Sequence, residues 1–480
     1  MLRQTFPYVS LCLVFWASSI IFARFSLDAP FAADDLHLVR TYSSAELRGV
    51  WWDTWDPDRL ETGGFRPLTT IFNHFRARLL GESPVAHRVF LLGLFSLFLT
   101  LAVFLARFVF EIPYAQGLLA GLFAFLHKGN AYHYLWISDG VHLVSGILIL
   151  SSVAMFLLSI RHRNYLLSLA ALLLSSAALL TREDSLIVYP LLFIFGGAFI
   201  LINRCLTKSP SPLPIVVFTF IASTLILLSF WTWRTVVVPD ARAPRFDVAD
   251  FIWSVKQTVE NLGDSAQLTV WSKYYVYLIW LATVCLGTVL GAFLFGIGRQ
   301  ARLQAMFWGS AIVIGALPGL TYPRLNLLLL PITFWGLFTA TVLGGLAARS
   351  SLGCLGAAAL SVVLLSLSAF GSISLQREYM PANLDWICEH TDWIYGDRSG
   401  ASIPQPRREL VTAQLNQYGI YSLSGLRNQL PQLVADAQNG GRFGPDAGSG
   451  PFVPRWKFLP PGSWRMWSCA GTRITFIEER

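Results

Sequence analysis

Two adjacent carboxylates, Asp34 and Asp35, follow the first hydrophobic stretch of this 480-residue chain. Acidic side chains are scarce here, because 54% of the residues are hydrophobic and only 13% are charged. A carboxylate in this place could deprotonate a hydroxyl group or hold a metal ion. It could equally cap a helix or belong to a solvated loop, and the pair alone does not decide between these roles.

Other side chains suited to chemistry stand near the ends of later hydrophobic stretches. They are His37, Arg66, His74, His87, His133, Trp136, Asp139, Arg182, Glu183 and Arg324. Arginines near a membrane surface bind phosphate well, and a carboxylate beside them can act as a base. This combination suits transfer of a group from a lipid phosphate to a hydroxyl, because the cations stabilise the charge on the leaving phosphate.

Plainer roles remain open for several of these residues. Arg182 and Glu183 could form a surface ion pair of little energetic value, and Arg66 could be an anchor that reaches the lipid headgroups. The histidines expected to be structural are His74, His87 and His133. Two carboxylates and a histidine could hold a divalent metal ion, but the ligand spacing of zinc sites is absent from the sequence, so we assign no cofactor.

Hydrophobic segments long enough to cross a membrane must position these residues. Apolar runs near the length that a spanning helix needs occur at 7–25, 88–108, 115–127, 140–160, 165–181, 186–202, 214–238, 274–297, 303–320, 325–346 and 351–371. The sequence therefore predicts an α-helical polytopic membrane protein with about eleven transmembrane helices. The loops of such a protein explain the net charge of +8, which does not indicate nucleic-acid binding.

The basic residues predict the orientation of the chain, because lysine and arginine are retained in cytoplasmic loops. With the N-terminus in the cytoplasm, that side holds Arg3, Arg107, Arg161, Arg163, Arg204, Lys208, Arg299, Arg302 and Arg349, with Glu111 as its acid. We therefore expect a multi-pass protein of the plasma or inner membrane. Its first loop (26–87), its second large loop (239–273) and its C-terminal tail lie outside the cytoplasm, and the first span is interpreted as an uncleaved anchor.

The sequence divides into two predicted domains. Residues 1–373 form a membrane domain, and residues 374–480 form a small extracytoplasmic domain of mixed α and β structure, with strands expected at 419–423 and 473–477. Cys388 and Cys469 are the two cysteines of this tail. A disulfide between them is predicted for an oxidising compartment, with two buried thiols as the alternative.

Local signals predict helices in the outer loops. Ser43 and Glu46 form the pattern of a capping box, and Ser83 followed by Pro84 is typical of a helix start. Apolar residues spaced three to four apart over 248–262 predict an amphipathic helix on the membrane surface or over a site. The tryptophans within 51–55 could form an interfacial aromatic belt or a surface on which a sugar stacks.

Several of these motifs resemble those of GT-C type integral-membrane glycosyltransferases. The stretch Asp34-Asp-Leu-His37 resembles the Asp-Glu dyad that opens the first outer loop of the protein O-mannosyltransferases. Phe65-Arg-Pro-Leu68 is similar to the Tyr-Arg-Pro-Leu stretch of the transmembrane TPR-containing mannosyltransferases, and residues 136–139 and 181–184 resemble their later loop motifs. Arg324 with residues 329–331 is a weaker likeness. The resemblance covers residues 1–200 in order, within a group that includes the aminoarabinose transferases, although the dyad here is Asp-Asp and no TPR array follows.

The resemblance implies a polyprenyl-phosphate sugar donor and direct displacement at the anomeric carbon. It implies that Asp34 is the general base and that Asp35 orients it or the acceptor. The residues expected to bind the donor phosphate are Arg66, Arg182, Arg324 and His37. The residues expected to bind the rest of the substrates are Glu183, Asp139 and Trp136.

The predicted function is therefore transfer of a hexosyl or pentosyl group from a lipid-linked donor to an acceptor hydroxyl on the extracytoplasmic face, as part of cell-envelope glycosylation. The expected partners are the donor, a glycan, lipid or protein acceptor, and membrane lipids. The alternative is a transporter or flippase of lipid-linked sugars. A proton or ion pathway would place ionisable residues in mid-membrane, and the spans carry few of them.

Overall fold

The computed structural model describes residues 2–24, 26–27, 29, 35–53, 55, 64–81, 83–204, 213–238, 252, 285, 287–321, 325–389, 465–470 and 473–478. For 2–6, 36–37, 201–204, 319–321, 325–326, 377–389 and the two strands it describes the backbone alone. Asp34, Arg324, the predicted strand 419–423 and nearly all of the predicted helix 248–262 thus lie outside the described residues. The side chains of His37, Cys388 and Cys469 also lie outside them, so the predicted disulfide stays a prediction.

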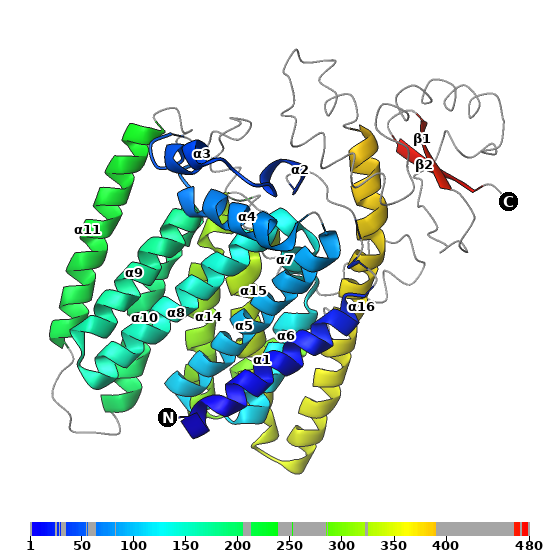
Figure 1. The fold of residues 1–480 in the computed structure, drawn as a ribbon. Coiled ribbons are helices and arrows are strands. Elements are labelled where there is room, and N and C mark those ends of the chain that lie inside the picture. The colour runs from blue at the N-terminus through cyan, green and yellow to red at the C-terminus, as the bar shows by residue number, and fades with distance from the viewer. Residues whose placement is uncertain are drawn as a thin grey trace.

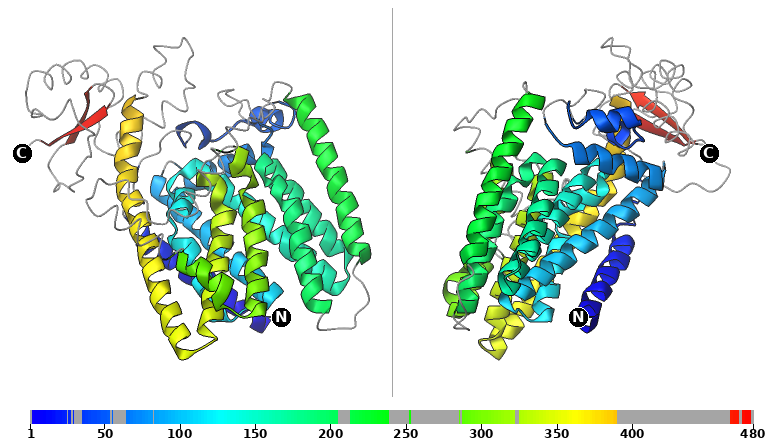
Figure 2. Two further views of the ribbon diagram at one scale, coloured as in Figure 1. Left: turned by 180° about the vertical axis from the view of Figure 1, so that it is seen from behind. Right: turned by 60° about the vertical axis from the view of Figure 1, so that its left-hand side comes forward.

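Long helices form a bundle, and short helices cross one end of it, called the upper end here (Figures 1 and 2). The elements up to residue 139 are α1 (Leu2–Phe22), α2 (Asp35–Leu38), α3 (Ser44–Gly49), α4 (Pro67–Leu80), α5 (Pro84–Phe110), α6 (Tyr114–Leu126), α7 (Lys128–Leu135) and η1 (Ile137–Asp139). Then follow α8 (Gly140–His162), α9 (Tyr165–Thr181), η2 (Glu183–Ile187), α10 (Val188–Arg204), α11 (Leu213–Val237), η3 (Ala292–Gly296), α14 (Arg299–Thr321), η4 (Leu325–Leu328), α15 (Leu329–Ala347) and α16 (Ser351–Glu389).

Six described helices are long and apolar enough to cross a membrane, so the chain is a polytopic helical membrane protein. They are Pro84–Phe110, Ile137–His162, Glu183–Ile200, Leu213–Val237, Leu329–Ala347 and Ser351–Gln376. Four shorter apolar helices, Pro7–Phe22, Tyr114–Leu126, Tyr165–Thr181 and Gly287–Gly296, overlap four more of the predicted spans. The total of eleven stays a prediction.

The helices differ in how much of their surface the protein covers. In the most apolar window of α15, 78% of the residues are buried, whereas in α11 only 17% are buried. α15 is therefore a central helix of the bundle. α11, which stands at its margin in Figure 1, exposes Leu225, Leu228 and Trp231 among other apolar side chains. An apolar helix with so little cover faces the lipid.

Both predicted helix starts in the first outer loop are confirmed. The hydroxyl of Ser43 accepts a hydrogen bond from the Glu46 N–H, and the Glu46 carboxylate accepts one from the Ser43 N–H, which completes the capping box of α3. Ser83 caps α5 through the N–H of Ala86, and Pro84 is its first helical residue. Such caps satisfy backbone donors that a helix start leaves unpaired. They fix where the loop ends and the span begins.

The helix that ends the membrane part continues past the predicted domain boundary. α16 runs from Ser351 to Glu389 and so crosses the boundary at 373/374. Two further strands near the C-terminus, β1 (Arg465–Ala470) and β2 (Arg473–Glu478), pair antiparallel. β2 confirms the strand predicted at 473–477.

Candidate functional site

Asp35, the second acid of the dyad, is buried at the upper end of the bundle. Its Oδ1 accepts a 2.5 Å hydrogen bond from the backbone N–H of Ser138 in η1, and none of its surface is exposed. Burial raises the pKa of Asp35 to about 6, although the Ser138 N–H and the charges of Arg88 and Arg76 oppose the rise. Asp35 is thus attached to the turn between α7 and α8.

Arg76 connects α4 to the same turn. Its Nη1 donates a 2.5 Å hydrogen bond to the carbonyl oxygen of Ile137, and the residue is only 2% exposed. Burial lowers the pKa of Arg76 to about 10, and the charge of Asp35 partly opposes this fall. A guanidinium in such surroundings still carries its charge at neutral pH, so Arg76 balances the carboxylate of Asp35.

Arg88, at the start of α5, holds three backbone segments together. Its Nε donates to the carbonyl of Leu135 at 3.0 Å, and its Nη1 donates to the carbonyls of Leu27, at 3.1 Å, and Ala29. None of its surface is exposed. The end of α7 and the chain between α1 and the dyad are therefore fixed to one guanidinium, whose charge also reaches Asp35.

Asp139, the last residue of η1, lies between two histidines. Its Oδ2 is 2.8 Å from His133 Nδ1, and its Oδ1 is 3.2 Å from His142 Nε2. All three side chains are 6% exposed or less. The carboxylate therefore lies between the two imidazole rings at ion-pair distance, without the alignment of a hydrogen bond. The three residues form a buried His–Asp–His row at the upper ends of α7 and α8.

The start of α4 packs on the corner between α9 and η2. The Phe65 N–H donates to Glu183 Oε1 at 2.8 Å, and the Thr69 hydroxyl donates to the carbonyl of Thr181 at 2.6 Å. Glu183 also accepts from Nε and Nη2 of Arg234, at 2.6 and 3.3 Å. One carboxylate therefore joins the first loop to α11, and its cationic partner is Arg234.

Arg182 makes an ion pair with Asp184, whose Oδ1 lies 2.9 Å from Arg182 Nε. The pair between Arg182 and Glu183 considered from the sequence is therefore not the one formed in the described part of the chain. The guanidinium of Arg66 lies 5.6 Å from the ring centre of Trp55, within the range of a cation–π contact. The charges of Arg66 and Arg182 both act on His142, so both arginines belong to one region.

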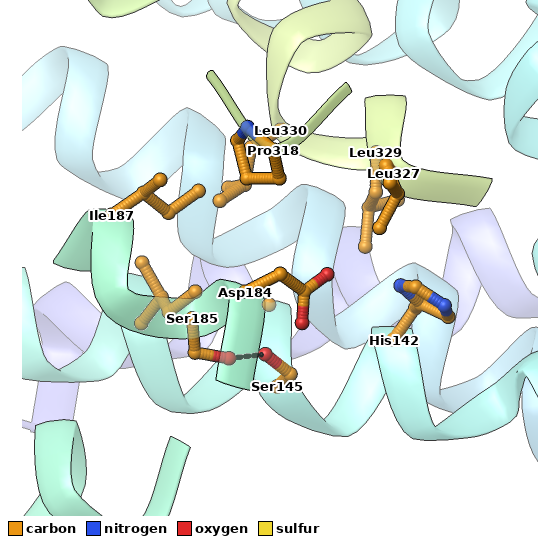
Figure 3. A pocket seen from close by; sticks show the side chains of 11 residues that line it. His142, Ser145, Asp184, Ser185, Ile187, Pro318, Leu327, Leu329 and Leu330 are labelled. Carbon is orange, nitrogen blue, oxygen red and sulfur yellow. Dashed lines mark hydrogen bonds between the residues drawn. The ribbon is translucent and has the colours of Figure 1, made fainter. Parts of the chain in front are cut away.

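A small cavity opens beside this region (Figure 3). Its volume is about 30 Å³, and it is lined by His142, Ser145, Gly146, Ile149, Asp184, Ser185, Ile187, Pro318, Leu327, Leu329 and Leu330. The polar side chains from α8 and η2 occupy one side, where the hydroxyls of Ser145 and Ser185 hydrogen-bond at 2.5 Å. The apolar side chains of Pro318, Leu327, Leu329 and Leu330 occupy the other.

The structure brings together most of the residues singled out from the sequence that it describes. Asp35, Arg66, Trp136, Asp139, Arg182 and Glu183 all lie at the upper end of the bundle. Two of the histidines expected to be structural make short local contacts: His74 Nδ1 accepts the Tyr42 N–H at 2.9 Å, and His87 Nε2 lies 2.9 Å from the carbonyl of Gly81.

Arg76 and His142 are among the residues of this region that the sequence analysis did not assign to the site. The signal for His142 is its spacing, because a helical residue three positions after Asp139 lies on the same face. Arg76 gives no such signal, since its partner is a backbone carbonyl brought from a distant turn. Within the described residues, no group of three or more His, Cys, Asp or Glu side chains is arranged to hold a metal ion.

Comparisons with known proteins give distant structural similarities. No family model and no curated protein matches the sequence. The crystal structure of ArnT from Cupriavidus metallidurans bound to undecaprenyl phosphate is 12% identical, and the alignment covers 99% of this chain and 98% of that chain with a TM-score of 0.41. The apo structure of the same ArnT is 11% identical over the same shares of each chain, with a TM-score of 0.46. Both TM-scores are below 0.5, so these similarities do not show a function for this chain.

Proposed function

We propose that this protein is an integral-membrane glycosyltransferase. It takes a sugar from a polyprenyl-phosphate donor and transfers it to an acceptor hydroxyl at the extracytoplasmic face, which corresponds to the upper end of the bundle. The proposal rests on motifs of the first 200 residues that resemble those of GT-C enzymes and on the way these motifs meet in space.

The observation that carries the proposal is that four separate motifs are joined in pairs by hydrogen bonds. The dyad is bound to the 136–139 turn through Asp35 and the Ser138 N–H. The 65–68 motif is bound to the 181–184 motif through the Phe65 N–H and Glu183. Arg76 of α4 then links the two pairs by its bond to the Ile137 carbonyl. Ionisable groups gathered from distant segments are typical of a functional site.

The distribution of charge between the two ends supports the orientation. The described basic residues at the lower loops include Arg107, Arg161, Arg163, Arg299 and Arg349. Lysine and arginine in short loops between spans mark the cytoplasmic face, and these lower loops hold one described acid, Glu111. The upper end, where acids and arginines occur together, is then extracytoplasmic, and a donor lipid in that leaflet presents its phosphate at the headgroup level.

The proposed reaction is a direct displacement. The carboxylate of Asp34 takes the proton of the acceptor hydroxyl, the acceptor oxygen attacks the anomeric carbon, and the bond from that carbon to the phosphate oxygen breaks. The polyprenyl phosphate leaves with the electron pair. Arg66 and Arg182 stabilise its charge, with His37 and Arg324 as further candidates. Asp35, which is buried and bonded to backbone, holds the dyad in place.

The test is transfer of radiolabelled sugar by the purified full-length protein in liposomes. The donors are polyprenyl-phosphate hexoses and pentoses, and the acceptors are membrane lipid, glycan and peptide extracts. Asp34→Asn should reduce transfer by at least about a hundredfold, the usual minimum contribution of a general base, while the variant elutes from a sizing column as wild type does.

The matched control is Glu111→Gln, which removes an exposed acid at the opposite end of α5 and should retain transfer. Wild-type activity in Asp34→Asn would remove Asp34 from its role. Absence of transfer from every donor by the wild-type protein would overturn the assignment as a glycosyltransferase.

A further inference from the structure

The cavity beside His142 has one polar wall and one apolar wall. Figure 3 shows Asp184, Ser185, Ser145 and His142 on one side, with Leu330, Pro318, Leu329 and Leu327 opposite. A single water molecule could hydrogen-bond to the polar wall, but it would also place a polar group against the apolar wall. A ligand that carries both carbon and a hydroxyl matches both walls.

The polar wall is held in a defined arrangement. The Nε2 of His142 lies 3.2 Å from Asp139 Oδ1 without the alignment of a hydrogen bond, and Nδ1 is the ring nitrogen farther from that carboxylate, which we assign to the ligand. Asp184 gives one oxygen to Arg182, and a carboxylate has acceptor capacity beyond a single bond. The wall therefore offers hydrogen-bond acceptors in fixed positions, which suits a ligand with an O–H donor.

The charged groups that face this wall come from several elements. Arg66 and Arg182 act on His142 from the start of α4 and from the corner after α9, and His133 and Asp139 act on it from α7 and η1. The cations compensate the carboxylates of Asp139 and Asp184. The wall is thus nearly balanced in charge, which favours a neutral hydroxyl over an ion.

The size of the cavity limits the ligand to a small group. One water molecule needs roughly 10–15 Å³ of such space, so about 30 Å³ accepts two heavy atoms. A whole sugar ring does not fit. A hydroxymethyl group, with one carbon and one oxygen, does fit.

We infer that this cavity is a specificity subsite that takes the exocyclic hydroxymethyl group of a hexose, with the CH₂ against Leu329 and Leu330 and the hydroxyl bonded to His142 and Asp184. The inference rests on the proposed function and deepens it, because it selects hexosyl over pentosyl transfer. A pentose ring lacks the hydroxymethyl group and leaves the polar wall unpaired. Sites built around a substrate hydroxyl strongly reject analogues without it.

The experiment compares donors that differ only in the hydroxymethyl group. Polyprenyl-phosphate glucose is paired with xylose, galactose with arabinose of matching configuration, and mannose with lyxose. The wild-type protein should prefer one hexose over its pentose partner by at least about tenfold in kcat/KM, the lower limit for losing one methylene contact. Equal rates for every pair would overturn the inference.

Two variants test the cavity itself. Ser145→Val replaces a hydroxyl by a methyl group at the cavity wall, and Asp184→Asn keeps the volume but removes the charge of an acceptor. Each should lower the hexose-to-pentose ratio by a large part of the roughly tenfold preference that one such contact contributes. Ser152→Val is the matched control, because Ser152 is a buried serine of the same helix whose hydroxyl bonds to the Ala171 carbonyl away from the cavity. Its ratio should equal that of the wild type.

The outcomes separate the subsite from the reaction. If no donor supports transfer, the proposed function fails. The subsite is then tested by measuring how tightly the protein binds the same lipid donors, from the quenching of tryptophan fluorescence. Tighter binding of the hexose donor by the wild type than by Ser145→Val and Asp184→Asn would support the subsite. A ratio that none of these variants changes, in rate or in affinity, would overturn it.

Discussion

Titration of Asp35 should make the free energy of unfolding of this protein depend on pH. The substitution Asp35→Asn should remove that dependence. The side chain is fully buried, and burial raises its pKa from 3.8 to about 6. The folded protein therefore binds a proton on Asp35 more tightly than the unfolded chain does. Asp35→Asn removes this titration while it keeps an oxygen that can accept the Ser138 N–H.

The magnitude follows from the shift. One pKa unit corresponds to about 1.4 kcal/mol, so a rise of about two units corresponds to about 3 kcal/mol. Because the folded pKa is raised, this stabilisation is complete below the unfolded pKa of 3.8 and is lost as the pH rises through about 6. The free energy of unfolding of the wild type minus that of Asp35→Asn should therefore fall by about 2.5 kcal/mol between pH 4, where the unfolded carboxyl is already partly ionised, and pH 7.5.

The assay is unfolding of the purified protein in detergent, followed by circular dichroism at half-unit pH steps. Ser138→Ala provides a second variant, because its hydroxyl also bonds to the Asp35 carboxylate and lowers the pKa of that group. In Ser138→Ala the midpoint of the difference curve should move to higher pH. Parallel curves for the wild type and Asp35→Asn over the whole range would refute the reasoning that Asp35 is buried and titrates near pH 6.

Two further predictions concern contacts between segments. Glu183→Gln should lower the free energy of unfolding by about 1.5–3 kcal/mol, the value of hydrogen bonds to a charged group. The reason is that the Glu183 carboxylate accepts hydrogen bonds from Arg234 and from the Phe65 N–H. A double-mutant cycle with Arg234→Leu in the same unfolding assay should give a coupling energy clearly above zero. Gly336→Ala should cost about 1–3 kcal/mol, because its Cβ would lie 2.8 Å from the Ala120 carbonyl oxygen of α6. Gly309→Ala, with nothing within 4 Å of the new Cβ, should be neutral or stabilising by thermal melting.

The elements of the fold were largely predictable because their signals are local. Apolar runs predict spanning helices, and the Ser43–Glu46 and Ser83–Pro84 patterns predict helix starts that the structure confirms. The boundary at 373/374 was drawn where hydrophobicity ends. α16 continues to Glu389 because helix formation needs only local hydrogen bonds and does not depend on an apolar environment.

The candidate site was predictable only in part because its partners are distant in sequence. The sequence indicated that Asp35, Asp139 and Glu183 lie at one membrane face. It could not indicate that Asp35 bonds to a backbone N–H, or that Glu183 selects Arg234 over the neighbouring Arg182. These hydrogen bonds depend on how the helices pack, because packing decides which donor lies within hydrogen-bond distance of each carboxylate.

The three residues whose carbonyls accept hydrogen bonds from Arg88 are synthesised at different times. Leu27 and Ala29 leave the ribosome before Arg88, whereas Leu135 follows it by 47 residues. Until α6 has been inserted and α7 has folded, the guanidinium lacks one of its acceptors, and a partly paired charge remains hydrated rather than buried. Closure of the Arg88 contacts therefore waits for α6 and α7, so the chain between α1 and α2 becomes fixed only after two further helices have been made.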